Sequence, residues 1–497
     1  MRNRLRFVLC LATAGCLPVV SRAELSTPAR EVLDHMMAFV DPLWDERAGF
    51  IWTPNTVTPD GPRVHRVRET GWYALGLLQR DAPGDRARAV QAFTAILEHQ
   101  ISDPDQPWDG TFHRYPEERQ LTLFPEMWRD YDPNWRQFIG TTFALAMIKF
   151  GDRLPAALRV RLLKSTERAV DGERGHGRLR PTYTNIALMQ AFLLGYAGSA
   201  LERPELVREG DQLAEAVHAA FREHDAFEEY NSPTYYGVDF YGLALWRAHG
   251  VTPLIRGLGA ALEAALWRDT AAFYHAGLRN LCGPYDRAYG MDMRRYASLT
   301  GLWLRIEGGD TAPFPALDRP MGHAHDFVFA APFIVLGTEI PEEARAAFRT
   351  FSGERRVERQ LPRGRVATAW LGENVMLGGE HTNKSRGAGG EHNQLHPATI
   401  HWRTPAGGIG WVLLKEAPRL DARAEPGRLV ISAVGDFTYR ISAPGLAAGK
   451  LARDRWRLPG LTVAVATDAT GFTVSPGEGG IIDVTYREAT RFELRVE

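Results

Sequence analysis

Hydrophobic residues recur every three or four positions from Ser26 to about Ala330, which is the period of α-helices that bury one face. The first of these segments begins with Thr27-Pro28, a combination typical of a helix N-terminus. Later segments come in pairs, and turns containing Gly, Asp or Pro separate them. We predict helices over residues 28–40, 69–79, 86–99, 138–150, 155–170, 184–196, 204–222, 238–248, 253–275 and 297–306.

The pattern changes after about Pro341. Short runs now alternate apolar and polar residues or are rich in β-branched residues, and Gly, Pro and Asp separate them. Such runs are typical of an antiparallel β-sandwich. We predict strands over residues 365–371, 399–402, 410–414, 428–434, 436–441, 461–467, 471–475, 481–486 and 491–496.

This order predicts an α+β multidomain protein, with an (α/α) toroid over residues 24–340 followed by an antiparallel β-sandwich over 341–497. A chain of 497 residues is also too long for one ordinary hydrophobic core. In a toroid each helical hairpin buries one face on its neighbours, and the loops at one end surround a cleft. An open α-solenoid would show the same periodicity and stays an alternative.

Residues 1–23 have the pattern of a signal peptide. A basic start leads into the apolar run from Phe7 to Val20, and Ser21-Arg22-Ala23 offers small residues for cleavage after Ala23. We therefore expect a secreted or periplasmic protein. Thr13-Ala14-Gly15-Cys16 resembles a lipoprotein cleavage box with Thr in place of the usual Leu, so lipidation is the alternative.

Net charge and cysteine content limit the kinds of binding partner and of disulfide that we expect. The net charge of −1 gives no basic field for nucleic acid, and the chain beyond the leader has no long apolar helix for a membrane. Cys10 and Cys16 lie in the leader, so the mature chain would keep Cys282 alone and form no internal disulfide. We expect Cys282 to be a small buried apolar residue.

The segment 228–241 concentrates the most candidate chemistry, with four tyrosines and three carboxylates. Asn231-Ser232-Pro233 predicts a turn, because Pro disfavours a helical residue before it and Asn and Ser bond their own backbone. The following residues predict a helix. The polar cluster would therefore lie on a loop at a helix entrance, where functional side chains are often presented. The competing interpretation is an aromatic loop that plugs the end of a helical bundle.

Three further loops carry candidate residues. The loop 108–118 supplies aromatic rings and polar groups suited to sugars, and it could equally be an ordered surface loop. In the segment 180–185, Asn185 could hold a ligand carboxylate or cap a helix. The loop 283–296 combines tyrosine with arginine, which matters because a phenol with its ordinary pKa of about 10 becomes a base only beside cations. A salt-bridged structural loop is the alternative there.

Histidines cluster in the β-rich part. His381, His392, His396 and His401 lie close in sequence, around a Gly-rich connector that could reach the cleft. Histidine is the usual proton-transfer residue near neutral pH and the commonest metal ligand. No HExxH or CxxC spacing supports zinc here, and the group 323–326 with two histidines and an aspartate is a looser candidate. We expect no required cofactor, and a structural zinc or calcium ion stays an open alternative.

The leader, toroid and β-sandwich together resemble the architecture of the heparinase II/III, chondroitin and alginate lyases. The segment Glu229-Tyr230-Asn231-Ser232-Pro233-Thr234-Tyr235-Tyr236-Gly237 falls where those enzymes carry a loop with a His and a catalytic Tyr, and here Asn231 or Ser232 stands where that His is expected. The resemblance implies β-elimination on a uronic-acid-containing glycan. A base removes the C5 proton, an acid protonates the leaving oxygen, and amide or cationic groups neutralise the carboxylate.

Mapped onto this chain, the resemblance implies proton transfer by Tyr236 or Tyr235, with His392 or His396 as the second group. Asn185 and Asn231 would neutralise the substrate carboxylate, and Arg287 or Arg294 would lower the phenol pKa or bind an acidic sugar. The partner would be an acidic polysaccharide or oligosaccharide. The predicted substrate-binding residues are Trp108, Asp109, His113, Glu229, Asn231, Tyr241, Tyr289, Arg294 and His396.

Two other function classes stay open. A glycoside hydrolase on the same toroid would need a pair of carboxylates, which Glu228, Glu229, Asp239, Asp109 and Asp292 could supply. A non-catalytic glycan-binding protein would use the aromatic residues alone.

Overall fold

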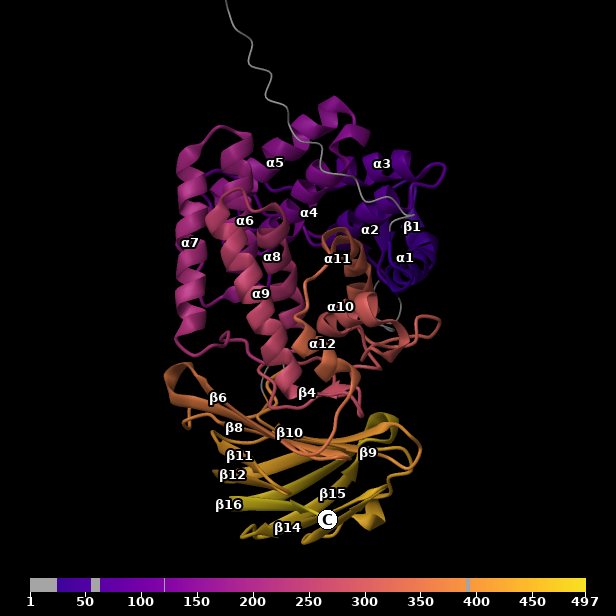
Figure 1. The fold of residues 1–497 in the computed structure, drawn as a ribbon, viewed down its shortest axis with the longest axis vertical. Helices are drawn as coiled ribbons and strands as arrows, with labels where there is room; N and C mark the ends of the chain where they lie inside the picture. Colours follow the sequence, from indigo (N-terminus) through magenta and orange to yellow (C-terminus); the bar gives the residue numbers. More distant parts are fainter. Residues whose placement is uncertain (1–24, 55–62, 120, 390–393) are drawn as a thin grey trace, which may run out of the picture.

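The computed structural model describes residues 25–54, 63–119, 121–389 and 394–497, with a helical part and a β-rich part stacked end to end (Figure 1). The helices of the described chain are α1 (Thr27–Val40), α2 (Val67–Arg80), α3 (Asp85–Leu97), α4 (Trp135–Phe150), α5 (Ala156–Arg174), α6 (Thr184–Ala200), α7 (Pro204–Arg222), α8 (Tyr235–His249), α9 (Pro253–Phe273), α10 (Leu299–Gly308), α11 (Ala330–Leu336) and α12 (Glu342–Arg349). None of them is both long and apolar enough to cross a membrane.

The helices form a closed ring. Inner helices α2, α4, α6 and α8 each contact the next, α8 contacts α10, and α1 joins α10 back to α2. Helices α3, α5, α7 and α9 pack outside as the second members of hairpins. Hydrophobicity explains the two positions: α6 is buried almost all round, whereas α7 buries one stripe. The predicted (α/α) toroid is confirmed.

Helix α11 lies inside this ring. All seven of its residues are buried, and it contacts α1, α2, α4, α8 and α10. A short 3₁₀ helix, η5 (Ala324–Phe329), leads into it. Helix α11 therefore fills the centre of the ring and leaves a hollow at one end. The short helix η5 forms the floor of that hollow.

The β-rich part contains β6 (Arg355–Leu361), β7 (Arg365–Leu371), β8 (Val375–His381), β9 (Ala398–Arg403), β10 (Ile409–Glu416), β11 (Asp421–Glu425), β12 (Arg428–Ser442), β13 (Arg455–Leu458), β14 (Leu461–Thr467), β15 (Gly471–Pro476) and β16 (Ile482–Val496). All pairings are antiparallel, in the order β13-β14-β16-β12-β10-β9-β8-β7-β6, with β11 beside β12 and β8 and β15 beside β16.

The two longest strands, β12 and β16, join the two layers of this sandwich. The first half of β12 pairs with β11 and its second half with β10, while β16 pairs with β15 in its first half and β14 in its second. The register shifts around Gly435, whose φ of 139° suits glycine. We predicted two strands, 428–434 and 436–441, where the structure has one bent strand.

Other boundaries differ from the prediction in explicable ways. Helix α8 begins at Tyr235, three residues before the predicted start, so Tyr235 and Tyr236 belong to the helix. Strand β6 was not predicted because it carries mostly charged residues and buries little. Helix α12 follows the predicted boundary at residue 340 but packs on α9, and the strands begin only at Arg355. Cys282 is buried, as predicted.

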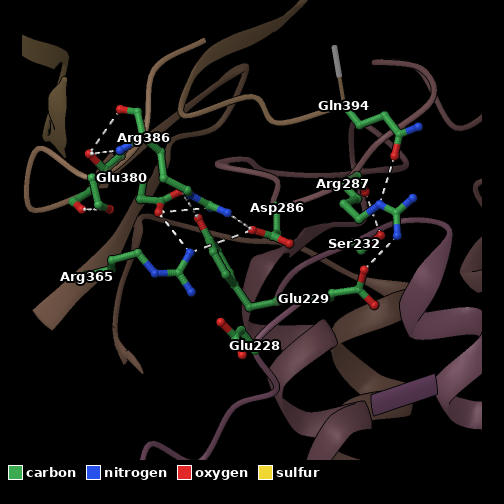
Figure 2. Close-up of polar contacts among 12 residues, drawn as sticks. Glu228, Glu229, Ser232, Asp286, Arg287, Arg365, Glu380, Arg386 and Gln394 are labelled. Atoms are coloured by element: carbon green, nitrogen blue, oxygen red, sulfur yellow. Dashed lines mark hydrogen bonds and ion pairs between the residues drawn. The ribbon is translucent and has the colours of Figure 1, made fainter. Parts of the chain in front are cut away.

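A buried group of charges holds the two parts together (Figure 2). The Glu380 carboxylate on β8 is fully buried and bonds to Arg365 at 3.3 Å and to Arg386 at 3.1 Å. From the helical part, the Tyr230 hydroxyl donates to Glu380 at 2.9 Å, and Asp286 pairs with Arg386 at 2.6 Å. The loops before α8 and α10 are therefore fixed against the sandwich.

Replacing Glu380 with Gln should destabilise the protein by about 3 kcal/mol, because Asp286 is then the one carboxylate among the described residues left to neutralise both the buried Arg365 and the half-buried Arg386. The measurement is the free energy of unfolding in denaturant, followed by fluorescence. The matched control is Glu358→Gln, which breaks an exposed ion pair with Arg423 and should leave the unfolding midpoint unchanged. Equal midpoints for the two variants would contradict the role assigned to Glu380.

Candidate active site

A cavity of about 270 Å³ lies at the end of the ring where the loops before α8 and α10 meet η5. Its walls mix aromatic rings with a few polar groups, as is usual for ligand sites. The lining residues are Arg68, Trp72, Phe138, Thr234, Tyr235, Val238, Tyr289, Leu299, His323, His325, Asp326 and Phe329.

Two phenols form the polar centre of this cavity. The hydroxyl groups of Tyr235 and Tyr289 lie 2.8 Å apart and share a hydrogen bond. The His323 ring stacks on Tyr289, with centroids 4.5 Å apart. The Arg287 guanidinium lies over the face of the Tyr235 ring, 3.8 Å from its centroid. A cation is thus held against a phenol that faces the cavity.

The Asn-Ser-Pro turn positions Tyr235. The Ser232 hydroxyl accepts a hydrogen bond from the Tyr235 N–H at 2.9 Å and donates to the Arg287 carbonyl at 2.6 Å. Asn231 adopts a left-handed backbone with a φ of 47°, and its amide donates to the carbonyls of Cys282 and Pro284. The turn is therefore tied directly to the loop that carries Arg287 and Tyr289.

Arg287 connects three segments that are distant in sequence (Figure 2). Its Nη1 donates to Glu229 at 2.7 Å, and its Nε donates to the Gln394 side chain at 2.8 Å. The Asn185 amide donates to the other Glu229 oxygen at 2.9 Å. Among the described residues, Nη2 of Arg287 has no hydrogen-bond partner, and Arg287 contacts the Tyr235 ring without itself lining the cavity.

Burial sets the protonation states here. It raises the pKa of Tyr235 well above the ordinary value, which Tyr289 reinforces and Arg287 partly opposes. Burial also raises the pKa of Tyr289 and of Glu229, against the effect of Arg287 on the carboxyl group. The pKa of His323 is lowered by burial. At neutral pH the cavity therefore presents neutral phenols, which are proton donors.

Several predicted site residues have structural positions instead. Tyr236 is fully buried and its hydroxyl donates to Asp269 at 3.0 Å, so it does not reach the cavity and Tyr235 replaces it as the candidate. Tyr241 is also fully buried, packed on Phe329. Neither Tyr236 nor Tyr241 lines the cavity, because residues of one helix point to different faces.

Asn231 and His396 also make structural contacts instead of facing the cavity. The Asn231 side chain is fully buried, and its amide donates hydrogen bonds to two backbone carbonyls. His396 pairs its backbone with Tyr285, and its Nε2 lies 3.3 Å from the Ala288 carbonyl. Burial lowers the pKa of His396 to about 4. Contrary to their prediction as substrate-binding residues, neither lines the cavity, and both instead connect loops.

Asn185 is neither a cap nor a residue that lines the cavity. Helix α6 begins at Thr184 without a side-chain cap, so the capping interpretation is wrong, and the Asn185 amide instead orients Glu229. His392 lies outside the described residues. Gln394, two positions later, was not predicted, and neither was Arg68, because neither belongs to a recognisable motif.

Four other predicted residues do not line the cavity. The Trp108 indole donates to Asp103, Asp109 pairs with Arg168 at 3.3 Å, and these contacts order the loop 103–110. His113 lies 3.7 Å from Glu118. Arg294 bonds to Asp292 at 3.4 Å. These contacts match the alternative we gave for both loops, in which the charged residues order the loop itself.

Two family models match this sequence, one over each part of the chain. Residues 30–338 match a domain of unknown function, DUF8769, and residues 356–481 match a second one, DUF8770. The chain belongs to the DUF8769 family. The two matched ranges coincide with the helical ring and with most of the sandwich. No curated protein matches the sequence.

Solved structures similar to this DUF8769 protein include three glycan-processing enzymes. Heparinase III is 9% identical with a TM-score of 0.47, covering 97% of this chain and 86% of its own. A mutant of chondroitin AC lyase from Streptomyces coelicolor A3 is 9% identical with a TM-score of 0.40, covering 94% and 79%. Endoglucanase CelQ from Clostridium thermocellum, in complex with cellobiose and cellotriose, is 9% identical with a TM-score of 0.32, covering 95% and 92%.

Each of these TM-scores is below 0.5, so the likenesses decide neither a family nor a reaction for this chain. At 9% identity the likeness concerns the fold alone, and it includes enzymes with different reactions.

One residue behind the site allows a pH test. Asp239, one turn after Tyr235, is fully buried, and neither carboxyl oxygen has a hydrogen-bond partner among the described residues. Burial, with Glu229 nearby, raises the pKa of Asp239 well above its ordinary value. The folded chain therefore keeps a proton that the unfolded chain releases above about pH 4.

Asp239→Asn should remove a component of stability that falls as the pH rises above about 4, by up to about 1.4 kcal/mol per pH unit. The measurement is the free energy of unfolding of both proteins between pH 4.5 and 6.5. The native protein should lose more stability with rising pH than the variant. Parallel curves would show that Asp239 titrates normally.

Proposed function

We propose that this protein is a polysaccharide lyase that cleaves an acidic, uronate-containing glycan by β-elimination. The observation that carries the proposal is the phenol pair of Tyr235 and Tyr289 in the cavity, with the Arg287 guanidinium against the Tyr235 ring. The similarity of the fold to heparinase III and chondroitin AC lyase is compatible with this reaction class.

Tyr235 would protonate the glycosidic oxygen as it leaves. Its raised pKa keeps the phenol protonated at neutral pH, and Tyr289 accepts or donates a proton 2.8 Å away. The phenolate formed in that step would lie against Arg287, which stabilises an anion. The proton leaves Tyr235 and forms the new O–H bond of the departing sugar.

Arg287 would also neutralise the substrate carboxylate. The C5 proton becomes acidic only when its neighbouring carboxylate is held by cations or donors, and we assign this role to Nη2 of Arg287, which lies next to the cavity against the Tyr235 ring. Glu229 and Asn185 orient the guanidinium and need not touch the glycan. We keep His392 as the proposed base for the C5 proton. Gln394, two residues later, is fixed beside Arg287.

A carboxylate-pair hydrolase fits the cavity less well. Among the described residues that line it, Asp326 is the one carboxylic acid. Glu229 lies close by, but Arg287 and Asn185 each take one of its oxygens. Asp239 is buried below the surface. Retaining and inverting mechanisms both require two carboxyl groups facing the same bond.

Tyr235→Phe should lower kcat/KM on uronate polysaccharides by about 10² to 10⁴, because it removes one proton-transfer group. The assay follows the near-ultraviolet absorbance of the unsaturated sugar that β-elimination creates. The control is Tyr236→Phe, its neighbour in the core, which should keep turnover and lose about 1 kcal/mol of stability with its hydrogen bond. Reducing ends without that absorbance, abolished by Glu229→Gln, would instead establish a hydrolase.

Arg287→Lys should lower kcat by about 10² or more, since a lysine cannot replace the guanidinium contacts that serve Glu229, Gln394 and the substrate carboxylate. Steady-state kinetics on one uronate glycan would measure this change. Arg294→Lys, in the same loop but bonded to Asp292, should leave kcat nearly unchanged. A similar loss in both variants would argue that the loop, rather than Arg287, is responsible.

A further inference from the structure

Three side chains of types that bind metal ions lie together on the cavity wall, next to Tyr289. His323, His325 and Asp326 each line the cavity, and one potential ligand atom from each lies within 4.8 Å of the others. Two imidazoles and a carboxylate are ligands suited to divalent transition ions such as Zn²⁺. None of these three side chains has a role in the proposed lyase reaction.

The backbone brings these residues together locally. His323 adopts a left-handed conformation with a φ of 50° and precedes η5, and the Asp326 N–H donates to the His323 carbonyl at 2.9 Å. This tight turn places the three side chains around one point, instead of spreading them as an extended chain would. A left-handed non-glycine residue is uncommon and often marks a functional site.

Neither ring nitrogen of His325 makes a short hydrogen bond with a described residue. Its Nδ1 is buried and has no hydrogen-bond partner among the described residues. Its Nε2 lies 3.4 Å from Asp326 Oδ1, which is long for an N–H···O hydrogen bond. Two ligands of a tetrahedral zinc ion, each about 2.0–2.2 Å from the metal, lie about 3.3–3.6 Å apart. The His325–Asp326 spacing therefore suits coordination better than hydrogen bonding.

The charges nearby also suit a cation. Arg68 lines the same cavity, but its guanidinium is paired with the buried Glu69 carboxylate at 2.9 Å. Asp326 is only 7% exposed. The local balance of Glu69, Arg68 and Asp326 is one negative charge, and buried charges are normally paired or coordinated to a metal.

We propose that His323, His325 and Asp326 bind one divalent transition ion of the zinc class. Closing the 4.8 Å span to coordination distance requires a small side-chain movement, chiefly of His323, because His325 and Asp326 already lie 3.4 Å apart. Three protein ligands leave at least one coordination position open. Because all three line the cavity, the open position faces the space beside Tyr289 and Tyr235.

The open position would take a carboxylate oxygen of the acidic glycan, on the side of the cavity away from Arg287. This second step rests on the proposed function, whereas ion binding itself does not. The two are therefore tested separately.

Binding is tested on the purified protein after dialysis against a chelator, by calorimetric titration with Zn²⁺ and by the visible spectrum on adding Co²⁺. We expect one ion per chain and ligand-field bands typical of imidazole and carboxylate ligands. His325→Ala and Asp326→Asn should each weaken binding at least tenfold, and His381→Ala, which changes a histidine on β8 paired with Asp421, should not. Circular dichroism would confirm that the variants fold, and His325→Gln provides a milder second change.

Absence of stoichiometric binding, or equal binding by His325→Ala, Asp326→Asn and the native chain, overturns the site. Turnover of a uronate glycan, measured with the ion present and removed, then tests the second step. A fall of tenfold or more on removal supports a role in substrate binding. A chain that binds the ion but turns over glycan equally without it refutes only that role. Ion binding without any elimination activity refutes the proposed function and leaves the metal site standing.

Discussion

The site depends on one half-buried guanidinium group. Arg287 bonds to Glu229 from the loop before α8 and to Gln394 from the segment before β9, and it covers the Tyr235 ring. Its pKa is lowered by burial but raised more strongly by Tyr235 and Glu229, so it stays charged. A permanent positive charge that is partly shielded from water attracts hydrogen-bond acceptors strongly. This explains why groups from three separate loops contact Arg287.

Contacts between the helical part and the sandwich hold these three loops in place around Arg287. Glu380 and its arginine partners fix the loops against the sandwich, and the backbone pairing of Tyr285 with His396 adds a second attachment. Buried polar groups of this kind tolerate few alternative arrangements, because each lost partner leaves an unsatisfied charge. The sandwich thus contributes rigidity and at least one side chain, Gln394, to the site.

The helical ring supplies the opposite wall. Helix α11 fills the centre, so a ligand cannot pass through the ring and is confined to the hollow above η5. The result is a cavity in which the neutral phenols lie next to the His323–His325–Asp326 group, with His323 stacked on Tyr289. This combination of a proton donor, a nearby cation and potential ion ligands is the basis of the proposed preference for acidic sugars.

The sequence by itself determined the periodic features. Amphipathic helices such as 204–222 and alternating strands such as 461–467 were predicted with their observed bounds, because burial of one face is recorded directly in local spacing. The turn at Asn231-Ser232-Pro233 was also predicted, since its conformation follows from residue type. These patterns were enough for the fold class and for the segment that carries the site.

Only the tertiary structure decided which side chains face the cavity. Tyr235 and Tyr236 are neighbours of the same chemistry, yet one hydroxyl meets Tyr289 and the other meets Asp269 in the core. Asn231, Tyr241 and His396 looked equally suited to ligands but satisfy backbone groups or pack inside. Arg68 and Gln394 reach the site from distant segments. Local sequence does not encode such contacts, because the direction of a helix face and the partner of a buried polar atom depend on what packs against them.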